Sequence, residues 1–318
     1  MTASNQQILV LGGAGFIGSN LVHALVAAGN RPRVFARPSR SNANLRYALD
    51  RIDIVRGDFM DDGVLKGALK GIDVVVHLIT TTFPNMVIES SNYDLLSNLL
   101  PTVRMLELAR EVGVSRIVYA SSGGTIYGEP KHLPIRETHP LEPISAYGQS
   151  KLTIENYLHF NARTTALETT VLRLSNPFGP GQNVYGAQGL IGVAMGCAID
   201  DRPLKVFGDG NTVRDYVYID DVTRALLIAI NAPPTVVNIS SGRGKTVNEV
   251  IAAIEEVSGK RVHRESLPAR TGDVAVSVLD NALAREKLHW QPDMSFETGI
   301  ERTWAAIHRA LGPPEFCR

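Results

Sequence analysis

Residues 9–21 read LVLGGAGFIGSNL, a short apolar run followed by closely spaced glycines and then by a helix-like pattern. Gly13, Gly15 and Gly18 satisfy G-x-G-x-x-G, and Gly12, Gly15 and Gly18 equally satisfy G-x-x-G-x-x-G. Glycines at a strand-to-helix turn let a pyrophosphate approach backbone N–H groups, and the helix N-terminus adds partial positive charge. The stretch therefore predicts a dinucleotide-binding turn. The residues expected to contact the dinucleotide there are Gly12, Gly15, Phe16, Ile17 and Gly18.

Outward from this turn, short apolar runs alternate with helix-length segments through the first half of the chain. The runs are rich in Val and Ile on consecutive positions, which is typical of strands buried on both faces of a parallel sheet. They occupy residues 8–13, 32–37, 52–58, 73–79, 116–122 and 169–175. Between them, residues 18–29 and 99–113 each read as a helix ended by a glycine. This alternation predicts an α/β protein of the Rossmann type, with a doubly wound parallel sheet.

The pattern changes where the Pro/Gly-rich stretch NPFGPGQN begins at Asn176. The chain beyond this stretch is more irregular, until a helix with a capping box at its start returns at residues 246–259. We therefore expect a dinucleotide-binding domain at residues 1–175. Residues 176–318 are expected to form mainly a smaller α/β substrate lobe, with some segments packing back on the first domain.

Composition narrows the class of protein. The 318 residues carry 32 Lys and Arg against 32 Asp and Glu, so there is no basic footprint for nucleic acid or an anionic membrane. Cys197 and Cys317 are far apart, which favours neither a disulfide framework nor a metal site. The start shows no signal-peptide pattern, and no stretch reaches about 18 apolar residues. We expect a cytoplasmic protein without a bound metal, whose ligands are small molecules.

The end of the second predicted strand bears on which dinucleotide is bound. An acidic residue about 20 positions past such a glycine turn normally binds the adenosine ribose hydroxyls of NAD. Here Ala36 and Arg37 occupy that zone, in RVFARPSR. A guanidinium there can pair with the 2′-phosphate of NADP. The sequence leaves NAD and NADP open and slightly favours NADP; the alternative is that Arg37 stacks on adenine or lies in solvent.

A second motif, AYGQSK at residues 146–151, places Tyr147 four residues before Lys151. On a helix these positions share one face, so the phenol and the ammonium would project the same way. With the glycine turn, the pair resembles the extended short-chain dehydrogenase/reductase family, in its nucleotide-sugar epimerase/dehydratase branch. Further segments similar to that family are GDF at 57–59, YASSGGTIYGE at 119–129, LRLSNPFGPGQ at 172–182, GDGNTVRDYVYIDDV at 208–222 and PARTGDV at 268–274.

The resemblance implies a reaction in which a sugar carbon is transiently oxidised by NAD or NADP. Tyr147 would take the proton of a sugar hydroxyl while hydride leaves the same carbon for the nicotinamide. An ordinary tyrosine has a pKa of about 10, and an ammonium about 4 Å away would lower it by roughly three units. Lys151 would thus tune Tyr147 and, by resemblance, also hold the nicotinamide ribose. Asp58, Phe59 and Leu78 are expected to contact the cofactor as well.

The third catalytic residue departs from the family pattern. Members similar to this chain usually carry Ser or Thr four residues before the position of Tyr127, where this chain has Gly123. Ser122 is the expected hydrogen-bond partner of the reacting oxygen, with Thr125 as the second choice. The same segment lacks the Thr-Asp-Glu that relatives use to eliminate water, so a dehydratase is disfavoured.

The resemblance further implies that the substrate is a nucleotide-diphosphate sugar. The matching positions are Asn176, Val206, Phe207, Arg214, Arg270, Asp273 and Ser277. The two arginines would contact the diphosphate, the asparagine would lie near it, the apolar pair would lie at the nucleotide base, and the aspartate would contact a sugar. Ser277 would stand beside carbon 2 of the transferred sugar. Because serine is small, N-acetylhexosamine nucleotides are expected to be accepted.

Three functions fit these features. The first is a UDP-sugar 4-epimerase of the UDP-glucose or UDP-N-acetylglucosamine type. The second is an NADPH-dependent 4-keto nucleotide-sugar reductase, which Arg37 favours. The third is a non-catalytic dinucleotide-sensing protein, which the retained Tyr147 and Lys151 disfavour. The apolar stripe LLSNLLPTVRMLELA at residues 95–109 predicts a helix that pairs two copies into a homodimer, although core packing explains it nearly as well.

Overall fold

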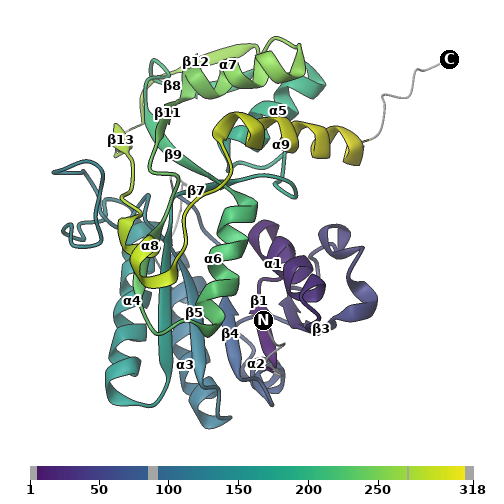
Figure 1. The fold of residues 1–318 in the computed structure, drawn as a ribbon, viewed down its shortest axis with the longest axis vertical. Helices are drawn as coiled ribbons and strands as arrows, with labels where there is room; N and C mark the ends of the chain where they lie inside the picture. The colour runs from purple at the N-terminus through teal and green to yellow at the C-terminus, as the bar shows by residue number, and fades with distance from the viewer. Residues whose placement is uncertain (1–5, 85–91, 271, 312–318) are drawn as a thin grey trace.

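The computed structural model describes residues 6–84, 92–270 and 272–311, and shows a sheet-based part below a smaller part (Figure 1). Within these residues, seven parallel strands form the main sheet in the order β10-β6-β5-β4-β1-β2-β3. Their bounds are β1 (Ile8–Leu11), β2 (Arg33–Ala36), β3 (Asp53–Arg56), β4 (Val74–His77), β5 (Arg116–Ser122), β6 (Glu168–Leu174) and β10 (Val236–Ile239).

The order of strands reverses beside β1. The chain first winds outward through β2 and β3, then returns and places β4 on the other side of β1, so that Leu11 pairs with both Phe35 and His77. Such a reversal opens a crevice outside the carboxyl ends of the strands, where open α/β sheets bind their ligands. The predicted Rossmann-type doubly wound sheet is confirmed.

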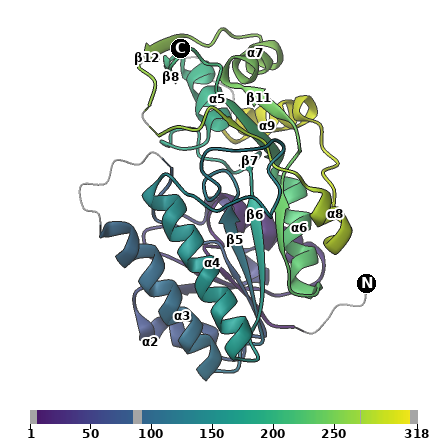
Figure 2. The same cartoon turned by 90° about the vertical axis from the view of Figure 1, so that its left-hand side faces the viewer.

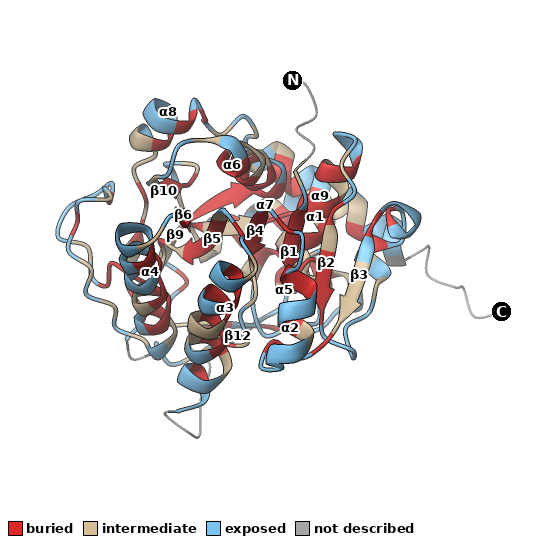
Figure 3. Cartoon of the chain, turned by 90° about the horizontal axis from the view of Figure 1, so that it is seen from below, coloured by how far each residue is buried: buried red, intermediate tan, exposed pale blue. Residues whose placement is uncertain are grey.

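Helices cover both faces of this sheet, as Figure 2 shows for α3 and α4 on one side and α6 on the other. The layers are α1 (Phe16–Ala27) with α6 (Ile219–Asn231) on one face, and α2 (Asp62–Leu69), α3 (Leu100–Glu111) and α4 (Ala146–Thr164) on the other. Side chains alternate along each strand, so Val10 packs towards α1 and α6 while Leu9 and Leu11 pack towards α2 to α4. The central strands are therefore buried on both sides, whereas the edge strand β3 is only partly buried (Figure 3).

Helix α3 begins differently from its predicted form. A π-helical segment, η3 (Leu95–Leu99), runs directly into it, so the helical path starts before residue 99. Two short 3-10 turns, η1 (Ala43–Leu45) and η2 (Leu49–Arg51), lie between β2 and β3.

The smaller part is built around β9, which pairs with β7, β11 and β13, while β8 pairs with β12. Its elements are β7 (Asn176–Phe178), α5 (Leu190–Asp200), β8 (Leu204–Phe207), β9 (Val213–Tyr218), β11 (Gly244–Thr246), α7 (Val247–Ser258), β12 (Arg264–Leu267), β13 (Val276–Ser277) and α9 (Phe296–Leu311), with α8 (Ala282–Leu288) lying lower, near β10. The expected capping box is confirmed at the start of α7, where Thr246 and Glu249 bond reciprocally.

The chain passes between the two parts more than once. Both α6 and β10 come after residue 176, yet α6 covers the main sheet and β10 extends it by pairing with β6. Asp215 joins the parts from a buried position, because its carboxylate accepts backbone N–H groups of Ser241 at 2.9 Å and Gly242 at 3.0 Å. In the described part of the chain, no helix is long and apolar enough to cross a membrane.

Candidate active site

The residues predicted to contact the cofactor follow one another along the carboxyl edge of the main sheet. Gly12 comes directly after β1, and Arg37 directly after β2. Asp58 stands two positions after β3, and Leu78 directly follows β4. Ser122 ends β5 on the same edge. The strands are parallel, so the fold gathers these residues on both sides of the point where the strand order reverses.

The glycine turn between β1 and α1 leaves open a space that side chains at Gly12, Gly15 and Gly18 would fill. We call this turn the glycine cradle. Gly12 has a φ of +83°, which favours glycine. A Cβ at Gly18 would collide with the Gly12 carbonyl oxygen, and one at Gly15 would lie 3.1 Å from that oxygen. Phe16 and Ile17 open α1, where backbone N–H groups lack intrahelical acceptors and no acidic residue stands in the first turn. The cradle therefore fits a pyrophosphate.

Positive charge gathers beside this cradle. Arg56 donates hydrogen bonds to the carbonyl oxygens of Arg37 and Arg40, both at 2.8 Å, and so fixes the loop after β2. Arg40 in turn donates from Nε to the Ala14 carbonyl oxygen at 3.3 Å, which brings its guanidinium to the glycine turn. Arg37 itself is exposed. A 2′-phosphate would meet suitable donors here.

The other predicted cofactor contacts differ in their exposure. Asp58 is exposed, and its carboxylate accepts the Met60 backbone N–H at 3.0 Å. Leu78 is half-buried at the end of β4. Phe59 is buried, with its ring centroid 5.4 Å from that of His77. The Phe59 side chain is therefore packed in the interior, and its predicted contact with the cofactor stays a prediction.

Helix α4 is placed by close packing against the turn after β5. A Cβ at Gly148 would lie 2.7 Å from the Thr125 carbonyl oxygen, so the approach depends on glycine. One helical turn on, the Lys151 ammonium lies 5.6 Å from the centroid of the Tyr147 ring. The ammonium donates a hydrogen bond to the Ala120 carbonyl oxygen at 3.0 Å. The predicted pair is thus brought to the end of β5.

Burial opposes the expected lowering of the Tyr147 pKa by Lys151. Burial raises the pKa of Tyr147 to about 12, while a hydrogen bond with Ser122 acts to lower it and the charge of Asp94 acts to raise it. Burial also lowers the pKa of Lys151 to about 8, against the attraction of Asp94 and Glu155. Burial therefore has the largest effect on the pKa of each of the two groups.

Of the two candidate hydroxyls, Ser122 is the one that meets Tyr147, through the hydrogen bond that bears on its pKa. The Thr125 hydroxyl donates instead to the Ser122 carbonyl oxygen at 3.3 Å. Gly123 has no room for a side chain, because Cδ1 of Leu279 occupies the place of its Cβ. Packing of Leu279 thus explains why this chain lacks a hydroxyl at position 123.

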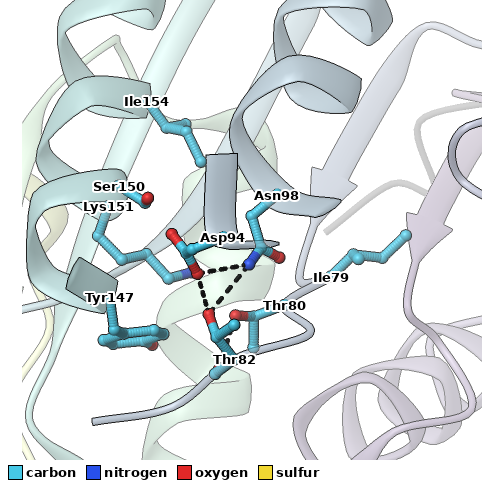
Figure 4. Close-up of a pocket in the computed structure, with 9 residues that line it drawn as sticks. All are labelled: Ile79, Thr80, Thr82, Asp94, Asn98, Tyr147, Ser150, Lys151 and Ile154. Atoms are coloured by element: carbon cyan, nitrogen blue, oxygen red, sulfur yellow. Dashed lines mark hydrogen bonds between the residues drawn. The ribbon is translucent and has the colours of Figure 1, made fainter. Parts of the chain in front are cut away.

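Asp94 is a further polar residue at this site, and no sequence motif identifies it. It is only 2% exposed, and its Oδ1 accepts hydrogen bonds from Asn98 Nδ2, at 2.9 Å, and from the Thr82 hydroxyl. Figure 4 shows this cluster facing Tyr147 and Lys151 across one pocket. The pocket is lined by Ile79, Thr80, Thr82, Asp94, Asn98, Tyr147, Ser150, Lys151 and Ile154. The available signal is the pair of polar residues Asp94 and Asn98, four positions apart at the start of the apolar stripe of residues 95–109.

On the substrate side, three of the predicted residues come together. Arg214 forms an ion pair with Asp273 and stands opposite Ser277, its pairing partner on β13. Ser277 is 4% exposed, so it lies beneath the surface. Asn176 donates from Nδ2 to the Asp215 carbonyl oxygen at 2.9 Å, which ties β7 to β9 beside this group.

Strand β8 turns its last two side chains in different directions. Val206 is buried in the core, so its side chain does not offer the expected contact for a nucleotide base. Phe207 is half-buried, and the Arg270 guanidinium carbon lies 3.5 Å from its ring centroid. Arg270 is therefore stacked on Phe207, whereas Arg214 is held by Asp273.

Residues 8–240 of this chain match the model of the NAD dependent epimerase/dehydratase family. The chain belongs to this family. The match runs from β1 to the end of β10, and so includes the glycine cradle and the Tyr147–Lys151 pair. The family resemblance predicted from the motifs is confirmed.

Individual members of the family are similar along nearly the whole chain. A putative UDP-glucose 4-epimerase of Methanocaldococcus jannaschii is 36% identical over 296 residues, which cover 93% of this chain and 96% of the relative. A dTDP-4-dehydro-6-deoxyglucose reductase of Escherichia coli is 30% identical over 316 residues, covering 96% and 99%. The crystal structure of a Thermotoga maritima UDP-glucose 4-epimerase with UDP-glucose superimposes with a TM-score of 0.91 at 36% identity, covering 96% of this chain and 100% of that one.

Proposed function

We propose that this chain is an NAD(P)-dependent UDP-sugar 4-epimerase of the UDP-glucose or UDP-N-acetylglucosamine type. The observation that carries the proposal is the convergence of Tyr147, Ser122 and Lys151 at the carboxyl edge that also carries the glycine cradle. Similarity to UDP-glucose 4-epimerases along the whole chain supports a UDP-sugar as the substrate.

Tyr147, Ser122 and Lys151 have different roles in the reaction at carbon 4 of the sugar. A bound nicotinamide supplies a hydride acceptor there and returns the hydride to the other face of the carbon. Tyr147 takes the proton of the 4-hydroxyl and gives it back in the reverse step. Ser122 holds the reacting oxygen within reach of Tyr147. Lys151, fixed by the Ala120 carbonyl, binds the nicotinamide ribose and contributes positive charge.

The pKa of Tyr147 sets a condition on this mechanism. At about 12, the phenol is neutral at physiological pH and a poor base. Each unit by which the pKa falls requires about 1.4 kcal/mol in favour of the phenolate. An oxidised nicotinamide bound beside Tyr147 would add positive charge to that of Lys151 and so favour the phenolate. Tyr147 therefore acts as a base only in the complex with oxidised cofactor, which couples proton removal to hydride transfer.

The test is turnover of UDP-glucose and UDP-N-acetylglucosamine by the cofactor-loaded protein, with the epimers separated by chromatography. We expect both sugars to be converted, the second because Ser277 is small. A Ser277→Tyr variant should keep the first activity and lose the second. Turnover of UDP-glucose alone by the natural chain would contradict the role of Ser277, and turnover of neither sugar would contradict the epimerase.

A 4-keto nucleotide-sugar reductase is the second candidate. The arginines beside the glycine cradle favour a phosphorylated cofactor, and the similar Escherichia coli protein is a reductase. A reductase consumes one NADPH for each sugar, whereas an epimerase regenerates its cofactor in every cycle. Sustained turnover without added reduced cofactor therefore supports the epimerase, and oxidation of NADPH in proportion to product supports the reductase.

For the cofactor, we propose a preference for NADP over NAD, based on Arg37 and Arg40. The dinucleotide released from purified protein is identified by mass, and the Kd of each dinucleotide is measured for the natural chain and for Arg37→Ala. We expect the variant to lose about tenfold in affinity for NADP and little for NAD, because a charge-assisted contact to phosphate contributes about 1.5 kcal/mol. Recovery of NAD alone, with no preference in vitro, would overturn this.

We also propose that the chain forms a homodimer through α3 and α4. Large apolar side chains are exposed on these neighbouring helices and on η3, which runs into α3: Leu96 at 51%, Leu100 at 56%, Tyr157 at 40% and Phe160 at 59%. An exposed apolar patch on a soluble protein marks an interaction surface. Sedimentation should give a dimer, and the double variant Leu100→Glu with Phe160→Glu should give a monomer. A monomeric natural chain would contradict the proposal.

A further inference from the structure

Asp94 presents a buried carboxylate oxygen with no hydrogen-bond partner among the described residues. Asn98 and Thr82 both donate to Oδ1, and Oδ2 is left free. A buried polar atom without a partner costs about 1–3 kcal/mol, and more when the group is charged. Native structures keep few such atoms, and those that persist call for a physical explanation.

The free oxygen belongs to the pocket that contains the Lys151 ammonium. Figure 4 shows Asp94 between Asn98 and Lys151, with Tyr147 below. Asp94 and Lys151 line the same pocket without forming an ion pair, and the carboxylate acts to raise the pKa of the lysine.

The other titratable groups around Lys151 are neutral or already paired. Tyr119, whose ring centroid is 4.8 Å from the ammonium, has a pKa raised well above its ordinary value by burial. Burial also raises the pKa of Tyr147, and it lowers the pKa of His77 to about 3. Glu155 is already paired, because it forms an ion pair with Arg173 Nη2 at 2.7 Å and accepts a hydrogen bond from the Ser121 hydroxyl.

Among the described residues facing Lys151, the carboxylate with an oxygen to spare is therefore Asp94. We propose that Asp94 is a positioning residue whose free oxygen keeps Lys151 protonated and favours the oxidised, positively charged nicotinamide over the reduced, neutral one. This rests on the proposed function, because it requires the nicotinamide to bind beside Tyr147 and Lys151. Two cations in one buried site repel each other, and a carboxylate beside them offsets that repulsion.

The proposal is tested by the affinities of the oxidised and reduced dinucleotide for stripped protein, measured by calorimetry without substrate. Asp94→Asn keeps the shape and a carbonyl oxygen for Thr82 and Asn98, but removes the charge. We expect its Kd for the oxidised form, divided by its Kd for the reduced form, to rise about tenfold over the natural chain. For a two-electron couple this corresponds to about 30 mV.

Thr82→Val is the matched control, because it removes a hydrogen bond to the same carboxylate and leaves the charge in place. Its affinity ratio should equal that of the natural chain. Asp94→Ser is the second charge-removing variant, in case the amide folds poorly, and should show the same rise.

An unchanged ratio in the charge-removing variants, or an equal shift in Thr82→Val, would overturn the role of Asp94 and leave the proposed function intact. A natural chain that binds neither dinucleotide form would instead contradict the proposed function.

Discussion

The carboxyl edge of the main sheet and the substrate side of the smaller part differ in what holds their functional groups. At the edge, backbone contacts do so: Gly148 lies against the Thr125 carbonyl, and the Lys151 ammonium bonds to the Ala120 carbonyl. On the substrate side, functional side chains hold one another, as Arg214 is paired with Asp273 and Arg270 is stacked on Phe207.

This difference indicates in which half of the site the functional groups already have their binding geometry before ligands bind. Groups fixed by backbone contacts keep their positions in the free protein, which is the condition for catalysis by preorganised dipoles and charges. Arginines held by side chains can exchange those partners for the diphosphate of a substrate, with a similar charge-assisted hydrogen bond. We infer that the cofactor half is preformed and that the substrate half rearranges on binding.

The largest effect is expected from Tyr147→Phe, which removes the proton carrier and nothing else from the preformed half. We expect kcat to fall about a thousandfold, because positioned general bases contribute roughly 10²–10⁴. Dinucleotide affinity should stay within about twofold. Tyr157→Phe, on the exposed side of the same helix, should keep full activity. A loss smaller than tenfold in Tyr147→Phe would remove the basis for a tyrosine mechanism.

Lys151 in the preformed half is a buried cation, and burying its charge lowers the stability of the folded protein. This loss of stability should depend on pH. Its folded pKa is about 8, whereas the unfolded chain holds this proton up to about 10.4. Between these values the unfolded state binds more protons, so stability should rise as the pH increases from about 8 to 10, by up to about 3 kcal/mol. Denaturant unfolding of stripped protein at several pH values measures this slope.

Lys151→Met should remove that rise, and Lys70→Met, which changes an exposed lysine, should leave it in place. An identical slope in all three proteins would show that Lys151 is not charged at a cost in the folded state. The substrate-side arginines are too basic to titrate in this range, so the difference in slope between the natural chain and Lys151→Met reports the lysine of the preformed half.

Much of that half was predictable from the sequence for a simple physical reason. Strands buried on both faces must be apolar on consecutive positions, so runs such as residues 73–79 and 116–122 identify them directly. The parallel fold then places the residues after each strand on one edge. The pKa of Tyr147 was not predictable in this way, because it depends on how much water the assembled fold removes from the phenol.

The substitution Gly148→Ala disrupts the backbone contact on which the preformed half depends. A Cβ there would lie 2.7 Å from the Thr125 carbonyl oxygen, so α4 must shift away from the turn that carries Ser122. We expect kcat to fall about a hundredfold from misplacement of Tyr147, with a loss of about 1–3 kcal/mol in stability.

Gly67→Ala is the control for that substitution, because a Cβ at this position in α2 would meet no atom within 4 Å. It should stabilise the protein by roughly 0.5–1 kcal/mol and leave kcat unchanged. Full activity in Gly148→Ala would show that the tyrosine is not held by this contact, and the contrast between the two halves would weaken.

Two features of the site lay beyond sequence reasoning because they depend on contacts between distant segments. Gly123 replaces the expected hydroxyl since Leu279, more than 150 positions away, fills the same space. Asp94 directly precedes the apolar stripe of residues 95–109, and its relation to Lys151 exists only once η3 packs beside α4. The burial of the Val206 side chain also depends on the assembled core, and the motif that placed Val206 at the nucleotide base carries no sign of it.

The smallest effect is expected from Arg214→Ala, which tests the half that rearranges. In the free protein Arg214 is paired with Asp273, so its gain on binding a diphosphate is reduced by the pair that it gives up. We expect KM for the UDP-sugar to rise about tenfold with kcat within about threefold, the pattern of an interaction equally strong in ground and transition states. Arg202→Ala, which removes an exposed arginine paired with Asp200, should change neither constant. If Arg214→Ala lowered kcat as far as Gly148→Ala while KM stayed constant, Arg214 would belong to the preformed catalytic machinery, and the division of the site into a fixed and a rearranging half would fail.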